Sequence, residues 1–182
     1  MGAAAAVTLV ARAKAAAQAL ALEKSCRDVD GMLLHVLAGR RGLERVAEIG
    51  TGTGVGTAWL ASALPPGIPL FTAELDERLA GAAAQLFAND PDVDVLHGDW
   101  RDVLPAHAPF DLIFVDGGSA KDDPDAVLAL AAPGATLVLD DFSSDRQRPD
   151  PRRESWLAHP RLVAVEIGTG QAAQAIVAVV RR

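Results

Sequence analysis

Hydrophobic and polar positions along the chain fall into blocks whose period switches between strand-like and helix-like. The strand-like blocks are short and almost continuously apolar: 44–49 (ERVAEI), 69–74 (PLFTAE), 93–97 (VDVLH), 110–116 (FDLIFVD) and 135–141 (ATLVLDD). Helix-like blocks lie between them, such as 54–64, which stops at Pro65-Pro66-Gly67, and the block that Asp76 caps. Strands that are apolar on both faces and alternate with helices predict a parallel sheet covered by helices.

Further helices are predicted before and within this core. Residues 3–23 are strong helix formers, and a second helix is expected after Asp28, as its N-cap, ending at Gly39. Another is predicted over 126–132, broken by Pro133-Gly134. We therefore expect a single domain over 1–182, with N-terminal helices in 1–40 and an α/β core in 45–182.

The last two apolar blocks depart from the alternation. Residues 161–167 (RLVAVEI) and 172–180 (AAQAIVAVV) are separated by only a few residues around Gly168-Thr169-Gly170. A parallel crossover needs a dozen or more residues, so these two strands are predicted to form an antiparallel hairpin. The pentapeptide EIGTG therefore occurs twice, at 48–52 and 166–170, and the second copy is predicted to be a structural turn.

The first copy of EIGTG opens a glycine-rich stretch between a strand and a helix. Gly50, Gly52, Gly54 and Gly56 permit close backbone approach, and the following helix offers free N–H donors. This arrangement favours an anionic or carboxylate-bearing ligand. The dinucleotide pattern G-x-G-x-x-G fails in every register and no phosphate-loop lysine follows, which excludes both of those nucleotide sites.

Composition narrows the classes of partner. The chain has 182 residues, with 17 Lys and Arg against 24 Asp and Glu, and a net charge of −7 disfavours nucleic acid. Cys26 is the only cysteine, which rules out an intramolecular disulfide, and we interpret it as a packing residue. Arg12 and Lys14 interrupt the alanine-rich start, and no apolar run reaches membrane-spanning length, so a cytoplasmic protein is expected.

Five motifs in order carry a resemblance to a known family. The runs VAEIGTGTGVGTAWLA, FTAELD, LHGDW, FDLIFVDGG and PGATLVLDDF resemble the class I S-adenosylmethionine-dependent methyltransferases, closest to small O-methyltransferases of the catechol O-methyltransferase type, over about 45–182. The resemblance implies a Rossmann-like, seven-stranded, mostly parallel sheet whose last strand alone is antiparallel, with helices on both faces. It also implies S-adenosylmethionine as cofactor, bound by Glu48, Gly50, Thr51, Gly52, Gly56, Glu74, Leu75, Gly98, Asp99, Trp100 and Asp116.

The resemblance gives several of these residues separate roles. The glycine loop would pass over the methionine part of the cofactor, with Glu48 below it. Glu74 would accept hydrogen bonds from both ribose hydroxyls, or else only cap the helix near Asp76. Leu75 would pack on the adenine and Asp99 would take its amino group, unless Asp99 is an ordinary loop acid. Trp100 would lie along the ring or cover the core.

The resemblance also implies a metal site, because in this family a divalent ion lowers the pKa of the acceptor hydroxyl. The corresponding ligands are Asp116, Asp140 and Asp141, and carboxylates without His or Cys favour Mg²⁺ or Mn²⁺. The alternative is that Asp140 and Asp141 cap the following turn and Asp116 contacts the cofactor only.

One position departs from the family pattern. The catalytic lysine of the family stands three residues after the first metal acid, and that position is Ser119 here. Lys121 is the candidate base, with Asp116 as the other catalytic candidate; a solvated loop lysine beside Asp122 and Asp123 is the favoured alternative.

The predicted function is methyl transfer to a hydroxyl of a small phenolic or catechol-like molecule, with metal assistance. A metal-independent methyltransferase and a cofactor-binding protein without turnover, suggested by Ser119, stay open. The roof of the acceptor pocket would come from the N-terminal helices, the loop after Asp116, residues 142–155 or the partner subunit of a homodimer. Nearby, Arg146, Arg148, Arg152 and Arg153 are interpreted as a solvated face, and Trp156 and Leu157 as cover for the final hairpin.

Overall fold

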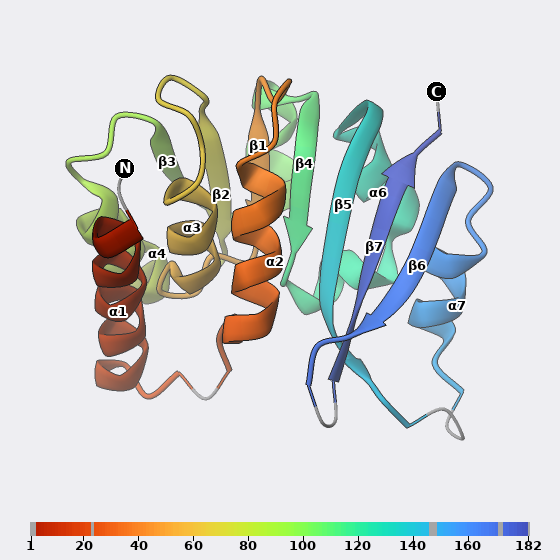
Figure 1. The fold of residues 1–182 in the computed structure, drawn as a ribbon, viewed down its shortest axis with the longest axis horizontal. Helices are drawn as coiled ribbons and strands as arrows, with labels where there is room; N and C mark the ends of the chain where they lie inside the picture. Colours follow the sequence, from red (N-terminus) through yellow and green to blue (C-terminus); the bar gives the residue numbers. More distant parts are fainter. Residues whose placement is uncertain (1–2, 23, 146–148, 171–172, 182) are drawn as a thin grey trace.

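A seven-stranded sheet forms the centre of the molecule (Figure 1). The computed structural model describes residues 3–22, 24–145, 149–170 and 173–181. The strand order is β3-β2-β1-β4-β5-β7-β6. The strands are β1 (Val46–Ile49), β2 (Leu70–Glu74), β3 (Val93–His97), β4 (Phe110–Val115), β5 (Ala131–Ser143), β6 (Leu162–Gly168) and β7 (Ala173–Val180).

One strand of the sheet runs against the others. β1 pairs in parallel with β2 and β4, and β7 is antiparallel to both β5 and β6, so the predicted terminal hairpin and the predicted sheet are confirmed. The order reverses at the neighbours β1 and β4, because the chain moves outward from β1 to β3 and then returns to β4. In open α/β sheets, ligands bind at the carboxyl ends of the strands beside such a point.

Helices cover both faces of the sheet. They are α1 (Ala3–Ala19), α2 (Asp28–Ala38), α3 (Val55–Ala61), α4 (Glu77–Phe87), α5 (Trp100–Val103), α6 (Pro124–Ala129) and α7 (Pro151–Leu157), with short 3-10 helices η1 (Pro105–His107) and η2 (Gly118–Asp122). In Figure 1 the helices α1, α2 and α3 lie in front of the sheet and α6 and α7 behind it. Among the described helices, none has both the length and the apolar character needed to cross a bilayer.

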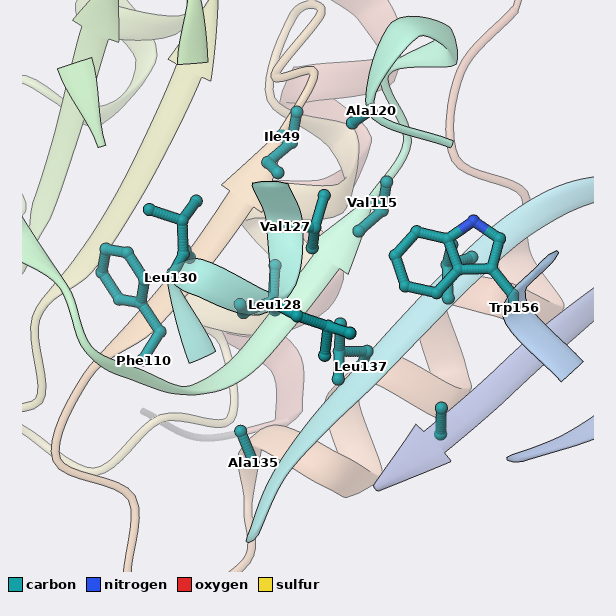
Figure 2. Close-up of a cluster of buried hydrophobic side chains, with 14 of the residues drawn as sticks. Ile49, Phe110, Val115, Ala120, Val127, Leu128, Leu130, Ala135, Leu137 and Trp156 are labelled. Carbon is teal, nitrogen blue, oxygen red and sulfur yellow. The ribbon is translucent and has the colours of Figure 1, made fainter. Parts of the chain in front are cut away.

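Each face of the sheet buries its own hydrophobic core. Because side chains alternate along a strand, Leu112 and Phe114 pack with α1–α4, whereas Ile113 and Val115 pack on the opposite side. Figure 2 shows this second core, where Val127 and Leu128 of α6 lie near Val115 and Leu137. Trp156 of α7 is fully buried in the same cluster, which confirms the packing role predicted for it.

Four local predictions need correction. The second helix begins at Asp28 itself with Arg27 as its N-cap, although its end at Gly39 is confirmed. The first helix ends at Ala19, and residue 23 lies outside the described residues. Residues 131–134 belong to β5, because Ala131 pairs with Phe110, so the helix predicted over 126–132 is shorter and starts earlier.

The fourth correction concerns the arginine run, of which residues 146 and 148 lie outside the described part. Arg152 is exposed as predicted, but Arg153 is only 7% exposed, and its Nε donates to Glu166 Oε1 at 2.8 Å. Helix α7, which carries both arginines, turns Arg153 toward the sheet and Arg152 toward solvent.

Candidate functional site

A cavity of about 120 Å³ lies at the carboxyl ends of β1, β2 and β3. Its lining includes six of the predicted cofactor residues: Gly50, Glu74, Leu75, Gly98, Asp99 and Trp100. Residues from three separate loops therefore meet around one space, as the parallel strand order requires. Ser119 and Gly117, from the loop after β4, close the remaining side.

The glycine loop after β1 packs tightly against the loop after β4. Gly50 has a φ of 95°, and a Cβ there would lie 2.6 Å from the nitrogen of Gly117. Gly117 N donates to Ile49 O at 2.6 Å, and Asp116 N donates to the same oxygen at 2.9 Å. A side chain at Gly50 would force these two loops apart and deform the floor of the cavity.

Glu74 connects the glycine loop to the start of α4. Its Oε2 accepts from Gly52 N at 2.7 Å and its Oε1 from Asp76 N at 2.9 Å. Both contacts fix the carboxylate at the cavity, and each oxygen keeps a second lone pair for a ligand hydroxyl. Asp76 itself caps α4, as the sequence predicts, by accepting from the backbone of Arg78 and Leu79.

The other end of the cavity combines an exposed apolar residue with an acid and an indole. Leu75 is 70% exposed, which is unusual for leucine and leaves its side chain available to a flat apolar ligand. Asp99 caps α5 by accepting from Arg101 N through Oδ1 at 2.9 Å. Trp100 is 6% exposed and packs in the hydrophobic core while lining the cavity, so both roles suggested for it are compatible.

Glu48 lies beneath this loop and does not line the cavity. Its carboxyl group is fully buried, and Oε2 accepts from the hydroxyls of Thr57 and Thr72, the latter at 2.7 Å. Burial raises the pKa of Glu48 to about 8, against the opposing effect of those two hydrogen bonds. A Cβ on Gly56 would collide with Glu48 Oε1, so Gly56 provides the space for this acid.

Thr51 also acts below the loop. Its Oγ1 lies 2.5 Å from Thr72 Oγ1, and its side chain is buried. The predicted methionine-binding set thus divides into Gly50 and Gly52 at the surface of the loop and supporting residues underneath.

Three acids converge beside the cavity. Asp116 follows β4, while Asp140 and Asp141 belong to β5, and one carboxylate oxygen from each lies within 4.8 Å of the others. Burial raises the pKa of Asp116 well above its usual value, and the Asp140 carboxylate raises it further. Burial likewise raises the pKa of Asp140, although the neighbouring Lys121 ammonium opposes the shift.

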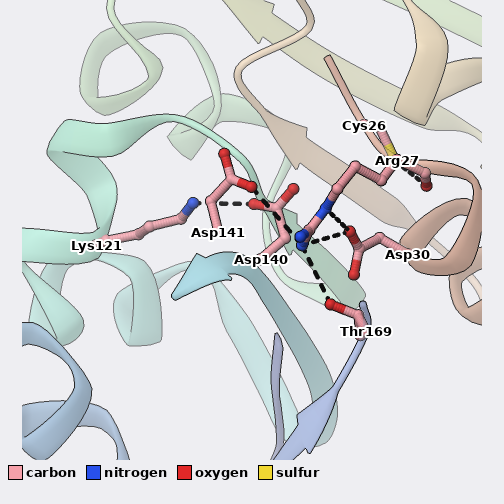
Figure 3. A network of polar contacts seen from close by, with 7 residues as sticks. All are labelled: Cys26, Arg27, Asp30, Lys121, Asp140, Asp141 and Thr169. Atoms are coloured by element: carbon pink, nitrogen blue, oxygen red, sulfur yellow. Dashed lines mark hydrogen bonds and ion pairs between the residues drawn. The ribbon is translucent and has the colours of Figure 1, made fainter. Parts of the chain in front are cut away.

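Lys121 is buried, so the prediction of a solvated loop lysine is wrong. Its side chain is 8% exposed, and Nζ donates to Asp140 Oδ1 at 2.9 Å. Trp156 Nε1 donates to the carbonyl oxygen of Lys121 at 2.9 Å, which fixes η2 against α7. The lysine therefore points into the acid cluster (Figure 3).

Arg27 is a site residue that sequence reasoning missed. Its Nε donates to Asp30 Oδ2 at 2.8 Å, and Nη2 donates to Thr169 Oγ1 at 3.1 Å and lies 3.7 Å from Asp141 Oδ1. Figure 3 shows Arg27 and Lys121 on opposite sides of Asp140 and Asp141. An Arg-x-x-Asp pair at a helix start was the only local signal, since Asp141 and Thr169 come from distant strands.

Cys26, next to Arg27, is buried at 3% exposure, as predicted for a packing residue. Burial first, and then the surrounding carboxylates, strongly raise the pKa of its thiol, which keeps the sulfur protonated and unreactive.

A larger cavity of about 410 Å³ opens beside Asp141. Its lining includes Lys24, Ser25 and Arg27 from the segment before α2, together with Phe142 and Ser143 from β5. These are two of the regions predicted to roof an acceptor pocket.

The oxygen atoms of the acid cluster are suitable ligands for a divalent ion, but the cations around the cluster do not suit such an ion. Three carboxylates are suitable ligands for Mg²⁺ or Mn²⁺. However, the Lys121 ammonium already bonds to Asp140, and the Arg27 guanidinium lies near Asp141. In the folded chain, cationic side chains of the protein itself therefore already lie beside two of the three acids.

Comparison with known proteins identifies the family. Residues 47–142, more than half of the chain, match a model described as a methyltransferase domain. The chain is a class I S-adenosylmethionine-dependent methyltransferase family member. The chain is similar to a solved structure of the O-methyltransferase TomG from Streptomyces achromogenes in complex with SAM, with a TM-score of 0.81, 30% identity, and coverage of 96% of this chain and 90% of that one.

Two curated relatives differ in the acceptor that their names specify. A catechol O-methyltransferase from Mycobacterium tuberculosis is 35% identical over 117 residues, covering 60% of this chain and 53% of that protein. A protein-L-isoaspartate O-methyltransferase from Pyrobaculum neutrophilum is 36% identical over 98 residues, covering 52% and 47%. The chain thus spans about half the length of these curated relatives.

Proposed function

We propose that the protein transfers a methyl group from S-adenosylmethionine to a hydroxyl of a small phenolic or catechol-like molecule. The observation that carries this proposal is the 120 Å³ cavity in which Glu74, Leu75 and Asp99 meet the glycine loop. In S-adenosylmethionine, the ribose diol matches Glu74, the flat apolar base matches Leu75, and the exocyclic amine of the base matches Asp99. The family membership and the SAM-bound structural neighbour support the same cofactor.

The remaining predicted cofactor residues take supporting parts in this proposal. Gly50, Thr51 and Gly52 form the loop for the methionine part of the cofactor. Glu48 and Gly56 lie beneath this loop and support it. Gly98 and Trp100 shape the adenine end, and Asp116 lies where the cofactor region meets the acid cluster. When bound, the cofactor supplies an electrophilic methyl group on a sulfonium.

The chain's own part in the reaction is to hold an acceptor oxygen in line and to favour its loss of a proton. The oxygen would gain the bond to the methyl carbon while the sulfur keeps the electron pair of the broken bond, and the hydroxyl proton would pass to solvent. The 410 Å³ cavity beside Asp141 is the proposed acceptor pocket. The net charge of −7 supports a small acceptor over nucleic acid, and a homodimer stays a prediction.

The positive charge near the acceptor oxygen can come from two sources, while the role of base predicted for Lys121 stays a prediction. In the metal-assisted form, Asp116, Asp140 and Asp141 would hold Mg²⁺ or Mn²⁺, which lowers the pKa of a bound hydroxyl. In the metal-independent form, the buried Lys121 contributes the positive charge. The Lys121–Asp140 bond of 2.9 Å favours the second form.

The test is methyl transfer from labelled S-adenosylmethionine to a panel of catechols, simple phenols and aliphatic alcohols. We expect transfer to phenolic oxygens, with S-adenosylhomocysteine as the other product. Tight binding of S-adenosylhomocysteine without transfer to any acceptor would favour the alternative of binding without turnover. Failure to bind it at all would contradict the proposal.

A further inference from the structure

The acid cluster is enclosed by two cations that belong to the chain itself. Lys121 reaches Asp140 from the loop after β4, and Arg27 approaches Asp141 from the segment before α2 (Figure 3). The two contacts measure 2.9 Å and 3.7 Å. Two of the three carboxylates, Asp140 and Asp141, therefore already face a cation of the chain before any ion arrives.

The Lys121 ammonium has little freedom to leave. The side chains of Lys121 and Asp140 are 8% and 3% exposed, and the backbone of Lys121 is held by the fully buried indole of Trp156. Removing one partner of such a buried pair leaves an uncompensated charge out of water, which is strongly unfavourable. An incoming divalent ion that took Asp140 would create that situation and would place a second cation beside the ammonium.

Arg27 is held in place as well. It donates to Asp30, whose side chain is fully buried, and to Thr169 in the turn between β6 and β7. Its guanidinium is permanently charged and cannot be neutralised to admit a metal. Both sides of the Asp140–Asp141 pair thus face a fixed positive group.

We infer that the Lys121 ammonium takes the place of the divalent ion, so that the proposed methyl transfer proceeds without metal. This inference rests on the proposed function and assigns the cation within it. The ammonium bonds to Asp140, and the next residue, Asp141, lines the proposed acceptor pocket. The buried ammonium thus places a fixed positive charge at the acid pair beside that pocket, where a low dielectric strengthens its effect. The acids then position Lys121 instead of binding a metal.

The experiment titrates Mn²⁺ into the full chain and follows the free ion by electron paramagnetic resonance. The variant Lys121→Met removes the charge and keeps an apolar stem, and Lys14→Met is the matched control, because Lys14 pairs with Asp28 on the surface. We expect the wild type and Lys14→Met to bind Mn²⁺ at least ~100-fold more weakly than Lys121→Met. Adding Asp140→Asn to Lys121→Met should abolish the gained site.

Two results of this titration would overturn the inference. One is stoichiometric Mn²⁺ binding by the wild type that Asp140→Asn removes, which decides the question even if Lys121→Met does not fold. The other is a folded Lys121→Met that gains no Mn²⁺ site, which would mean that the lysine does not fill a metal position.

Binding of S-adenosylhomocysteine to the same samples separates this inference from the proposed function. If the wild type binds both S-adenosylhomocysteine and Mn²⁺, only the inference about Lys121 fails. If it binds no S-adenosylhomocysteine, the proposed function fails whatever the metal does. A transfer rate that is unchanged by chelator supports the inference, and a rate that chelator abolishes contradicts it.

Discussion

The pentapeptide EIGTG occurs twice in this chain, and the two copies have different structures. At 48–52 it leads from β1 into the loop before α3, and Gly50 and Gly52 both have positive φ angles, 95° and 54°. At 166–170 it ends β6, where Gly168 still pairs with Gln174 of β7. The same five residues thus form a cavity floor in one place and a strand end in the other.

The two glutamates show how the surroundings decide the chemistry. Glu48 is buried beneath the loop with two threonine hydroxyls as partners, and burial raises its pKa to about 8. Glu166 lies against the guanidinium of Arg153, 2.8 Å away. A proton therefore neutralises one glutamate near neutral pH, whereas an arginine neutralises the other.

The second copy is not remote from the site. Thr169 accepts a hydrogen bond from Arg27, so the hairpin turn supports the residue that faces Asp141. The prediction of a turn between two strands holds, and the turn also orients a charged group that lines the 410 Å³ cavity.

The largest expected effect comes from removing Arg153, the cation that pairs with Glu166 of the second EIGTG copy. Arg153→Met should lower the free energy of unfolding by about 3–5 kcal/mol, because it leaves Glu166 buried without its arginine. Arg152→Met is the control, since its pair with Asp122 is exposed, and it should cost less than about 1 kcal/mol. Urea denaturation measures both, and equal losses would mean that the two pairs do not differ as described.

The equivalent glycines of the two copies should respond differently to alanine. Gly50→Ala combines a positive φ with a clash at Gly117, so we expect a loss of about 2–4 kcal/mol in stability. At Gly168 a Cβ would meet nothing within 4 Å, so Gly168→Ala should change stability by less than about 0.5 kcal/mol. A larger loss at Gly168 in thermal denaturation would contradict this assignment.

Cofactor affinity should depend on the first copy through Glu74, which accepts from Gly52 N. Glu74→Ala should weaken binding of S-adenosylhomocysteine by on the order of 2–3 kcal/mol, the value of charge-assisted hydrogen bonds to a ribose. Glu77→Ala, in the exposed first turn of α4, is the control and should bind normally. If calorimetry finds the same dissociation constant for Glu74→Ala and the wild type, Glu74 only caps the backbone near Asp76 and does not bind the cofactor.

The pH dependence of stability should report on Glu48. Its folded-state pKa of about 8 lies above the unfolded value, so its contribution is present at low pH and is lost as the pH rises through 8. Between pH 6 and 8 the wild type should lose about 2 kcal/mol more than Glu48→Gln, which has no proton to release. Parallel stability curves for the two proteins would show that Glu48 is ionised in the folded state.

Local patterns of hydrophobic and polar residues predict most of the sheet. They fail in alanine-rich stretches, where the hydrophobic positions show no clear helix or strand period. The helix predicted over 126–132 includes Ala131, yet Ala131 pairs with Phe110 in the sheet, and the register shifts before Leu112. Short apolar runs suit either structure, and here the neighbouring strand decides. Helix α7 was missed although Asp150 caps it and Pro151 opens it, which is a readable start signal.

The candidate site likewise has one part that the sequence predicts and another that it does not. The cavity residues follow from strand ends and could be predicted, because parallel strands bring their carboxyl ends together. The burial of Lys121 could not, since it depends on Asp140 and Trp156, which are 19 and 35 positions away. No local spacing encodes such a contact.

The first EIGTG loop and Glu74 are proposed to form an S-adenosylmethionine site. Calorimetric titration of the wild type with S-adenosylhomocysteine, and separately with NAD, tests it most directly. We predict saturable binding of one S-adenosylhomocysteine per chain and no binding of NAD; ligand at a hundredfold excess over Kd should stabilise the fold by about 2.7 kcal/mol. Binding of NAD without binding of S-adenosylhomocysteine would contradict the claim.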